Sequence, residues 1–262
     1  MKDVLDKIIE HKRAELKSYD FGNIESEARN VRRQTISMSR SIRNSTKGGI
    51  IAEFKRKSPS KGWINEGADP RKVISRYMEA GAAACSVLTN EEFFGGSLEF
   101  LKIAREVADG MPLLRKEFII DARQIYEARV AGADAVLLIA SCLTVEECAE
   151  LAKVAHSVGL EVLLEIHSEG ELSHLNDCVD MLGVNNRNLG SFVTDIANSF
   201  NLAKKMKACG NDIVLVSESG IDSAETIKSL QNVGFSSFLI GETFMKTERP
   251  ALALRKLIAE LC

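Results

Sequence analysis

The 262-residue chain has no apolar run long enough to cross a bilayer. The longest runs, such as Ala135–Ala140 and Phe238–Gly241, fall far short of the roughly 20 residues that a spanning helix needs. The first ten residues mix charged with apolar side chains and therefore lack the apolar segment of a signal peptide. The 45% hydrophobic and 27% charged content excludes a disordered chain. We therefore expect a globular, cytoplasmic protein that does not associate with a membrane.

The sequence also has no basic excess, since its formal net charge is −3. A protein that binds the phosphate backbone of nucleic acid normally carries a clear positive charge, so nucleic acid is not an expected partner. One local basic cluster, Lys55–Lys57 with Lys61, is present. It fits either a solvated face or a site for a small anion.

Patterns typical of metal sites are absent as well. The six cysteines show no Cys-x-x-Cys spacing, and the four histidines form no His-Glu-x-x-His pattern. We expect the cysteines to be free thiols used as small core residues, and we expect no bound metal.

What the sequence does contain is a regular alternation of short β-branched runs with longer amphipathic stretches. We predict strands at Ile50–Phe54, Ala84–Leu88, Pro112–Arg115, Ala135–Ile139, Glu161–Ile166, Met181–Asn185, Ile213–Ser217 and Ser237–Ile240. The helical patterns between them include Pro70–Ala80, Leu98–Ala108, Asp121–Ala131, Thr144–Ser157 and Ser223–Asn232. Eight such units over about 215 residues match the size of a (β/α)8 TIM barrel. An open doubly wound sheet is less favoured, because no Gly-x-Gly-x-x-Gly turn follows the first strand.

The segment before the first strand has no strand pattern. Val4, Leu5, Ile8 and Ile9 recur at helical spacing, and a second, polar helix is predicted over Ile24–Ser41. We therefore expect residues 1–262 to form a single α/β barrel domain, of which residues 1–46 are an N-terminal helical extension.

Charged side chains cluster at the predicted carboxyl ends of the strands, where such barrels place their active sites. Glu53 and Lys55 share one strand face because they are two residues apart. Other strands end at Lys116, at Glu165, and at Asn185 with Arg187. Each of these could be a solvated loop residue, but their convergence on several strand ends favours a ligand site.

The last two strand ends carry small, turn-forming residues. Ser219 and Gly220 follow the seventh strand, and Gly241 and Glu242 follow the eighth. Barrels often bind phosphate between these two loops through backbone N–H groups, and glycine permits the close approach that this requires. Simple tight turns are the alternative, but a phosphorylated small molecule is the favoured ligand.

Several motifs in this order are specific to one family. The segments Ile51–Gly62, Ser86–Thr89, Phe93–Ser97, Leu114–Ile119, Gly183–Leu189, Glu218–Ile221 and Ile240–Glu242 closely resemble the motifs of indole-3-glycerol-phosphate synthase. The resemblance covers essentially the whole chain. It implies a carboxy-lyase of tryptophan biosynthesis that needs no cofactor. The implied reaction closes 1-(2-carboxyphenylamino)-1-deoxyribulose 5-phosphate to indole-3-glycerol phosphate, carbon dioxide and water.

The resemblance also implies residue roles. Lys116 matches the general acid of ring closure, and Glu165 the carboxylate proposed for dehydration. Lys55 matches a contact to the substrate carboxylate, and Glu53 matches a group that supports the proton transfers. The groups that orient substrate and catalytic residues match Asn185 and Arg187. The phosphate cradle, in which Glu242 acts through its backbone N–H, matches Ser58, Ser219, Gly220, Gly241 and Glu242. The apolar walls for the anthranilate ring match Leu88, Phe94 and Phe118.

Two alternatives differ in chemistry. A phosphoribosylanthranilate isomerase would want a Cys and Asp pair at strand ends, and no cysteine follows the first or fifth strand. A non-catalytic barrel that binds a phosphorylated metabolite would be expected to have lost Lys116 or Glu165, and both are present. The sequence leaves open the oligomeric state and any association with other enzymes of the tryptophan pathway.

Overall fold

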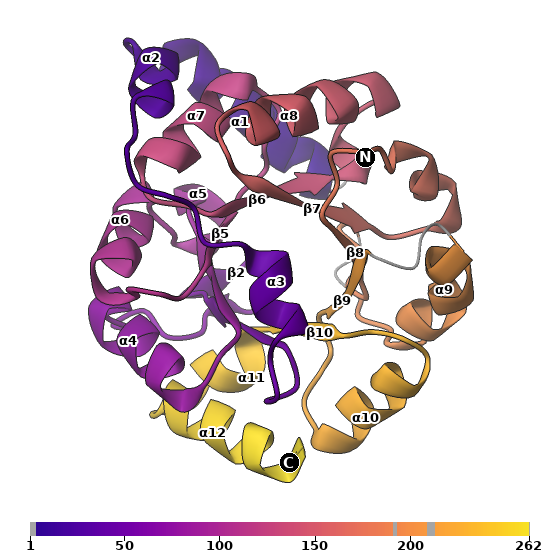
Figure 1. Cartoon of the computed structure of the whole chain (residues 1–262). Coiled ribbons are helices and arrows are strands. Elements are labelled where there is room, and N and C mark those ends of the chain that lie inside the picture. Colours follow the sequence, from indigo (N-terminus) through magenta and orange to yellow (C-terminus); the bar gives the residue numbers. More distant parts are fainter. Residues whose placement is uncertain (1–3, 191–192, 209–212, 262) are drawn as a thin grey trace.

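The computed structural model describes residues 4–190, 193–208 and 213–261. Eight parallel strands close into a barrel in the order β1-β10-β9-β8-β7-β6-β5-β4 (Figure 1). The strands are β1 (Ile50–Phe54), β4 (Ala84–Leu88), β5 (Leu113–Lys116), β6 (Ala135–Ile139), β7 (Glu161–Ile166), β8 (Met181–Asn185), β9 (Val214–Glu218) and β10 (Ser237–Ile240). The predicted (β/α)8 barrel is therefore confirmed, and the strand bounds differ from the predicted ones by one residue at most.

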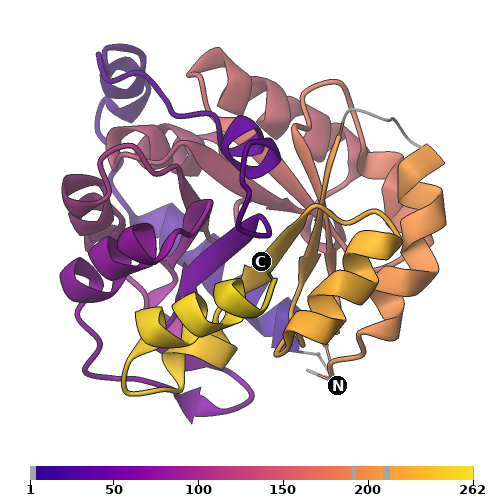
Figure 2. The ribbon, with the colours of Figure 1, turned by 60° about the horizontal axis from the view of Figure 1, so that its bottom comes forward.

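A ring of helices covers the outside of the barrel (Figures 1 and 2). The longer ones are α4 (Pro70–Ala80), α6 (Leu98–Val107), α7 (Ala122–Val130), α8 (Val145–Ser157), α9 (Ala197–Ala208), α10 (Ala224–Asn232) and α12 (Pro250–Leu261). Their starts follow the local sequence, since Asp69, Ser97 and Ser223 each accept a backbone N–H of the first turn. Short elements fill the loops: β2 (Lys57–Ser58), β3 (Gly62–Trp63), α5 (Glu91–Phe94), η1 (Ala140–Cys142), η2 (Glu169–His174) and α11 (Glu242–Met245).

The strands direct alternate side chains to the two faces of the barrel wall. One buried cluster fills the interior and includes Ile51, Leu114, Leu163, Val214 and Val216. The other cluster packs the outer face of the strands against the surrounding helices. Because side chains alternate along a strand, the residues two positions beyond these interior side chains also point inward, at the carboxyl end of the barrel.

The N-terminal extension contains α1 (Val4–Ser18), α2 (Ile24–Arg29) and α3 (Met38–Arg43). In Figure 1, α3 crosses the near end of the barrel, where Met38 and Ile42 join the interior cluster. Ser41 donates a hydrogen bond to the Ala83 carbonyl just before β4, which identifies this as the amino-terminal end of the strands. Helix α3 therefore closes the end of the barrel opposite to the carboxyl ends of the strands.

The prediction of a single helix over Ile24–Ser41 is wrong. The helix ends at Arg29, and a second one begins only at Met38. Between them, Arg33 bonds to the carboxylate of Asp134, and the backbone N–H of Ile36 donates to the same carboxylate. Ser37 then caps α3 and donates to Glu161. These bonds to the barrel hold the backbone extended, so tertiary contacts override the helical pattern.

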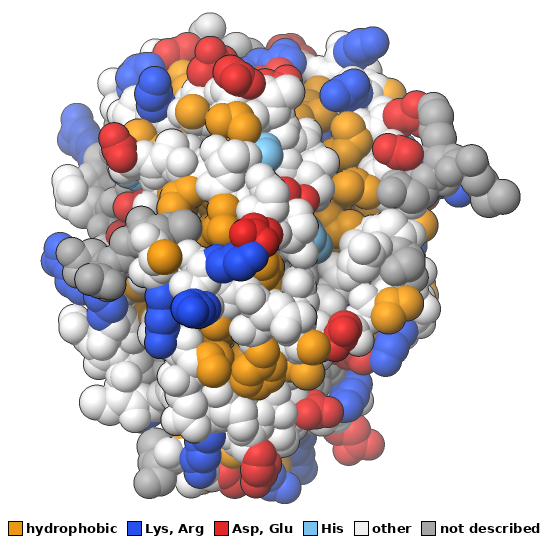
Figure 3. Space-filling view, turned by 90° about the vertical axis from the view of Figure 1, so that its right-hand side faces the viewer, with side chains coloured by type: hydrophobic (Ala, Val, Ile, Leu, Met, Phe, Trp, Pro, Cys, Tyr) orange, Lys and Arg blue, Asp and Glu red, His pale blue; other side chains and the backbone are white. Residues whose placement is uncertain are grey.

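The surface carries both charge signs. On the side of the molecule where α9 lies, positive and negative side chains are interspersed with small hydrophobic patches (Figure 3). No helix in the described part of the chain is long and apolar enough to cross a membrane. Four of the cysteines, Cys85, Cys142, Cys148 and Cys178, are free thiols as predicted. Cys209 and Cys262 lie outside the described residues.

Candidate active site

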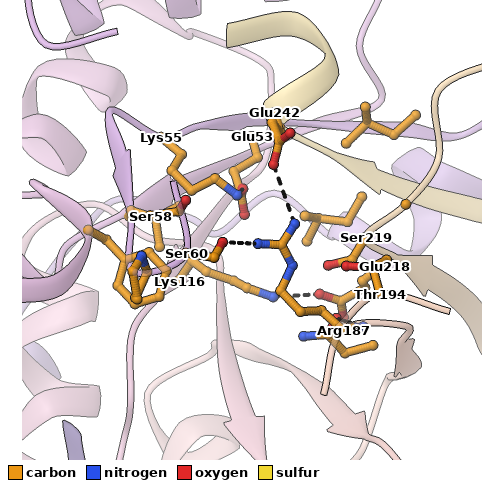
Figure 4. Close-up of a pocket in the computed structure, with 18 of the residues that line it drawn as sticks. Glu53, Lys55, Ser58, Ser60, Lys116, Arg187, Thr194, Glu218, Ser219 and Glu242 are labelled. Carbon is orange, nitrogen blue, oxygen red and sulfur yellow. Dashed lines mark hydrogen bonds and ion pairs between the residues drawn. The ribbon is translucent and has the colours of Figure 1, made fainter. Parts of the chain in front are cut away.

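A cavity of about 500 Å³ opens at the carboxyl ends of the strands. Charged side chains from several strands point into it (Figure 4). All of the site residues predicted from the sequence line this cavity: Glu53, Lys55, Ser58, Leu88, Phe94, Lys116, Phe118, Glu165, Asn185, Arg187, Ser219, Gly220, Gly241 and Glu242. The structure therefore brings the predicted residues together in one cavity.

Lys116 lies at the centre of a cluster of buried carboxylates. Its Nζ is 2.9 Å from Glu165 Oε2 and 2.5 Å from Glu218 Oε2, and both glutamates are 1% exposed. Burial alone would lower the pKa of Lys116, but the negative charges of Glu165, Glu218 and Glu53 outweigh it and raise the pKa above its usual value. Lys116 is therefore held in its protonated, ammonium form.

The pKa values of the two glutamates beside Lys116 are shifted in opposite directions. Burial raises the pKa of each, but Lys116 and His167 bring the pKa of Glu165 down to about 2. For Glu218, burial and the charge of Glu165 prevail over the attraction of Lys116, so its pKa rises to about 7. One carboxylate is thus ionised, while its neighbour can gain or lose a proton near neutral pH, as acid–base chemistry requires.

Glu218 was not among the residues to which the sequence analysis assigned a role. The predicted strand ends at Ser217, which leaves Glu218 as a loop residue. In the structure β9 includes Glu218, in the same alternation as the interior side chains of Val214 and Val216. The interior pattern Val-x-Val-x-Glu is the signal that could have identified it.

Glu53 and Lys55 form an ion pair within the cavity, with 2.6 Å between Glu53 Oε1 and Lys55 Nζ. Glu53 is 3% exposed and lies directly against the backbone of Gly241. Asn185 donates to Glu165 Oε1 at 3.1 Å and accepts the backbone N–H of Arg187. These contacts fix the orientation of the acidic groups around Lys116.

One side of the cavity is built from backbone at the ends of β9 and β10. Ser219 is the sole non-glycine residue with positive φ in the described ranges, at 69°, and Gly220 follows at 74°. Successive backbone N–H groups in such a conformation form a concave anion site. At Gly241 a Cβ atom would lie 2.3 Å from Glu53 Oε1, so any larger residue would have to displace the Glu53 side chain. This is the arrangement expected of a phosphate cradle.

Two cationic side chains, Arg187 and Lys61, and the hydroxyl of Ser60 lie beside this cradle. Arg187 contacts Ser60 at 3.0 Å and Glu242 at 3.3 Å, as dashed in Figure 4. Lys61 contacts the other oxygen of Glu242 at 2.5 Å. The loop after β1 is thereby tied to the loops after β8 and β10. The Glu242 side chain, which the sequence analysis left without a role, joins the two cations.

An apolar wall completes the cavity. It includes Leu88, Phe94 and Phe118, and the rings of the two phenylalanines are tilted with their centroids 6.1 Å apart. Among the described residues, no group of three His, Cys, Asp or Glu side chains is placed to hold a metal ion.

Comparison with known proteins identifies the family of the chain. A family model described as indole-3-glycerol phosphate synthase matches residues 5–257. The chain belongs to the indole-3-glycerol phosphate synthase family. A relative of that name from Bacteroides thetaiotaomicron is 50% identical, over 98% of this chain and 98% of its own length. Another from Carboxydothermus hydrogenoformans is 47% identical over 83% of each chain.

Solved structures with low sequence identity share the fold of this family member. The 3-hexulose-6-phosphate synthase of Salmonella typhimurium aligns with a TM-score of 0.63 at 16% identity, over 81% of this chain and 97% of that one. The tryptophan synthase alpha-subunit of Pyrococcus furiosus aligns with a TM-score of 0.60 at 13% identity, over 81% and 96%. These likenesses support the barrel fold alone.

Proposed function

We propose that this member of the indole-3-glycerol phosphate synthase family converts 1-(2-carboxyphenylamino)-1-deoxyribulose 5-phosphate to indole-3-glycerol phosphate, carbon dioxide and water. The observation that carries the proposal is the position of Lys116. It is a buried, protonated ammonium group between two carboxylates, in a cavity with an anion cradle on one side and an apolar wall on another. Both ends of the substrate are anionic and its centre is the carbonyl that must be protonated.

Phosphate recognition is assigned to the ends of β9 and β10. The left-handed conformations of Ser219 and Gly220 expose backbone N–H groups, and Gly241 permits close approach of the phosphate. Ser58 supports this assignment, because its hydroxyl is buried and has no hydrogen-bond partner in the described part of the chain. The phosphate would accept a hydrogen bond from that hydroxyl.

The anthranilate end of the substrate is assigned to the apolar wall of Leu88, Phe94 and Phe118, which would pack against the aromatic ring. Lys55, paired with Glu53, would hold the carboxylate that is lost as carbon dioxide. With both ends held, the substrate folds so that the ring carbon lies next to the ribulose carbonyl.

The acid–base steps are assigned to the cluster around Lys116. Lys116 protonates the carbonyl oxygen as the ring carbon attacks it, and carbon dioxide then leaves. The resulting hydroxyl departs as water after a second protonation, and a proton is removed from the adjacent carbon to complete the indole. Glu165 and Glu218 flank Lys116, and their separated pKa values suit one acid and one base for this dehydration.

The test is to mix the purified protein with this substrate in the absence of added metal or cofactor and to follow indole fluorescence. We expect catalytic formation of indole-3-glycerol phosphate. Lys116→Met should lower kcat by at least a thousandfold with little change in KM, because a general acid acts mainly in the transition state. The control Lys72→Met removes a lysine whose side chain is 74% exposed on α4 and should leave kcat unchanged. A flat trace from the folded wild-type protein would refute the proposal, and an active Lys116→Met would refute the role of Lys116.

The cytoplasm is the proposed location, as expected for an enzyme that makes an amino-acid precursor. Localisation of a tagged chain by cell fractionation would test it.

A further inference from the structure

His167 lies directly behind the acid–base cluster and has no place in the steps described above. It follows β7, two residues beyond Glu165, and its side chain is 14% exposed. Its Nε2 is 3.4 Å from Glu165 Oε1, and its Nδ1 is 3.7 Å from Glu171 Oε2. Both ring nitrogens are buried, and neither makes a hydrogen bond within the described ranges. The imidazole is therefore placed between two carboxylates, and a small rotation would bring it into hydrogen-bond contact with either.

The loop after β7 holds this arrangement in place. The backbone N–H of His167 donates to Glu171 Oε2 at 2.6 Å, which fixes η2 against the end of the strand. Asn198 of α9 donates to the His167 carbonyl at 3.0 Å. The ring position is thus determined by its own backbone and is independent of the cavity lining.

Exposure increases along the line from Glu165 through His167 to Glu171. The side chains are 1%, 14% and 20% exposed respectively. Glu165 faces the substrate cavity, whereas Glu171 does not line it. The three residues therefore connect the floor of the cavity with the outer rim of the barrel by a route that a bound substrate does not occupy.

The charged surroundings of the imidazole are acidic on every side. Glu165 belongs to β7, Glu171 to η2 and Glu218 to β9, and Cys142 of η1 is a thiol near the first two carboxylates. Burial alone would lower the pKa of His167, but Glu171, Glu165 and Glu218 together raise it above its usual value. The ring can hence carry a proton near neutral pH.

The proposed reaction consumes a proton in each turnover. The carbon–carboxylate bond breaks and its electron pair restores the aromatic ring, so the carboxylate leaves as neutral carbon dioxide. The carbonyl oxygen takes up two protons in succession and leaves as water, and one proton is released from the carbon next to nitrogen. Two protons enter and one leaves, so each turnover takes one proton from solvent, and the buried acids must be recharged with it.

We propose that His167 delivers this proton, passing it from Glu171 at the rim to Glu165 in the cavity, which transfers it at once to the departing hydroxyl. The inference rests on the proposed function, since it is this reaction that creates the demand for a proton. His167 does not touch the substrate and acts through Glu165. Its ring returns to the protonated form by taking a proton from solvent through Glu171.

The test compares His167→Ala with wild type across pH and in the presence of imidazole. We expect at least a tenfold loss of kcat at pH 8, a smaller loss at pH 6 where protons are abundant, and little change in KM. Added imidazole should restore kcat in proportion to its concentration, because it can enter the space left by the ring and carry the proton. Glu171→Gln should show the same dependence on pH. The control His156→Ala removes a histidine paired with Asp180, away from the cavity, and should behave as wild type.

The outcomes separate the two proposals. A wild-type protein without turnover refutes the proposed function itself. An active wild type with unchanged His167→Ala kinetics refutes only the proton route. A loss of kcat that is equal at all pH values and insensitive to imidazole assigns the ring a packing role and also overturns the inference. If His167→Ala does not fold, Glu171→Gln decides: normal kcat at pH 8 overturns the route.

Discussion

Lys12 of the N-terminal extension lies 3.3 Å from Glu117, the residue that follows Lys116. The two side chains are 4% and 2% exposed, so this ion pair is shielded from solvent at the carboxyl end of the barrel. Glu117 also accepts hydrogen bonds from Thr89, Asn90 and the backbone N–H of Phe118. The extension therefore contacts both ends of the barrel, through Lys12 at one end and through α3 at the other.

We propose on this basis that residues 1–46 and the barrel fold as one domain. The expected result is a single cooperative unfolding transition in urea, with circular dichroism and Trp63 fluorescence coincident. Lys12→Met should lower the free energy of unfolding by about 3 kcal/mol, because it leaves the buried charge of Glu117 without its ion pair. Lys17→Met, at an exposed position on the same helix, is the control. Two separate transitions would show instead that the extension is an independent unit.

The raised pKa of Glu218 predicts how stability depends on pH. Between its ordinary value of 4.5 and about 7, the native state binds more protons at this site than the unfolded state, so wild-type stability falls as pH rises. Glu218→Gln lacks this dependence. From pH 4.5 to 8 its free energy of unfolding should therefore rise relative to wild type by about 3 kcal/mol.

Glu165→Gln is the matched comparison, because the pKa of Glu165 is shifted in the opposite direction to that of Glu218. The pKa of Glu165 is lowered to about 2, so its carboxylate stabilises the native state above pH 4.5 and that contribution is lost as pH falls toward 2. Glu165→Gln should therefore be less stable than wild type at pH 8. Urea unfolding at pH 4.5 and pH 8 measures the change for Glu218→Gln, and at pH 8 it measures the lower stability of Glu165→Gln. A stability difference for Glu218→Gln that does not change with pH would contradict the assignment.

The periodicity of the strands predicted the barrel, because alternation of side chains is a local property of the sequence. The same alternation correctly places Glu53 and Lys55 in one cavity. The segment from Asn30 to Ser37 could not be predicted, since its extended conformation depends on Asp134 and Glu161, about a hundred residues away. Local pattern alone does not report such partners.

The functional surroundings of the site were also only partly predictable. His167 is visible in the sequence as a strand-end residue, but its position between Glu165 and Glu171 depends on how η2 folds back. The Glu242 side chain likewise forms ion pairs with Lys61 and Arg187, which come from loops far apart in sequence. Ion pairs between such loops can be identified only once the fold is known.

Gly241 tests the coupling between the phosphate cradle and the acidic cluster. Its backbone φ of −121° suits any residue, so Gly241→Ala introduces no backbone strain. The new Cβ would lie 2.3 Å from Glu53 Oε1 and must displace that side chain. We expect a higher KM and also a lower kcat, each by about tenfold, measured by steady-state kinetics. Gly67→Ala is the control, because a Cβ there meets nothing within 4 Å. A change in KM alone would show that Glu53 is not needed for the chemical steps.

The contacts of Glu242 predict that its carboxylate competes with the phosphate of the ligand for Lys61 and Arg187. Its oxygens pair with Lys61 at 2.5 Å and with Arg187 at 3.3 Å, and burial, which would raise its pKa, is outweighed by these two cations, which lower it. An incoming phosphate must attract the same cations. Glu242→Gln removes the competing charge and keeps the backbone N–H of the cradle, so inorganic phosphate should bind several-fold more tightly by isothermal titration calorimetry. Glu248→Gln, an exposed position that does not line the cavity, serves as the control. Weaker binding by Glu242→Gln would mean that the carboxylate holds Lys61 and Arg187 in place for the ligand and does not compete with it.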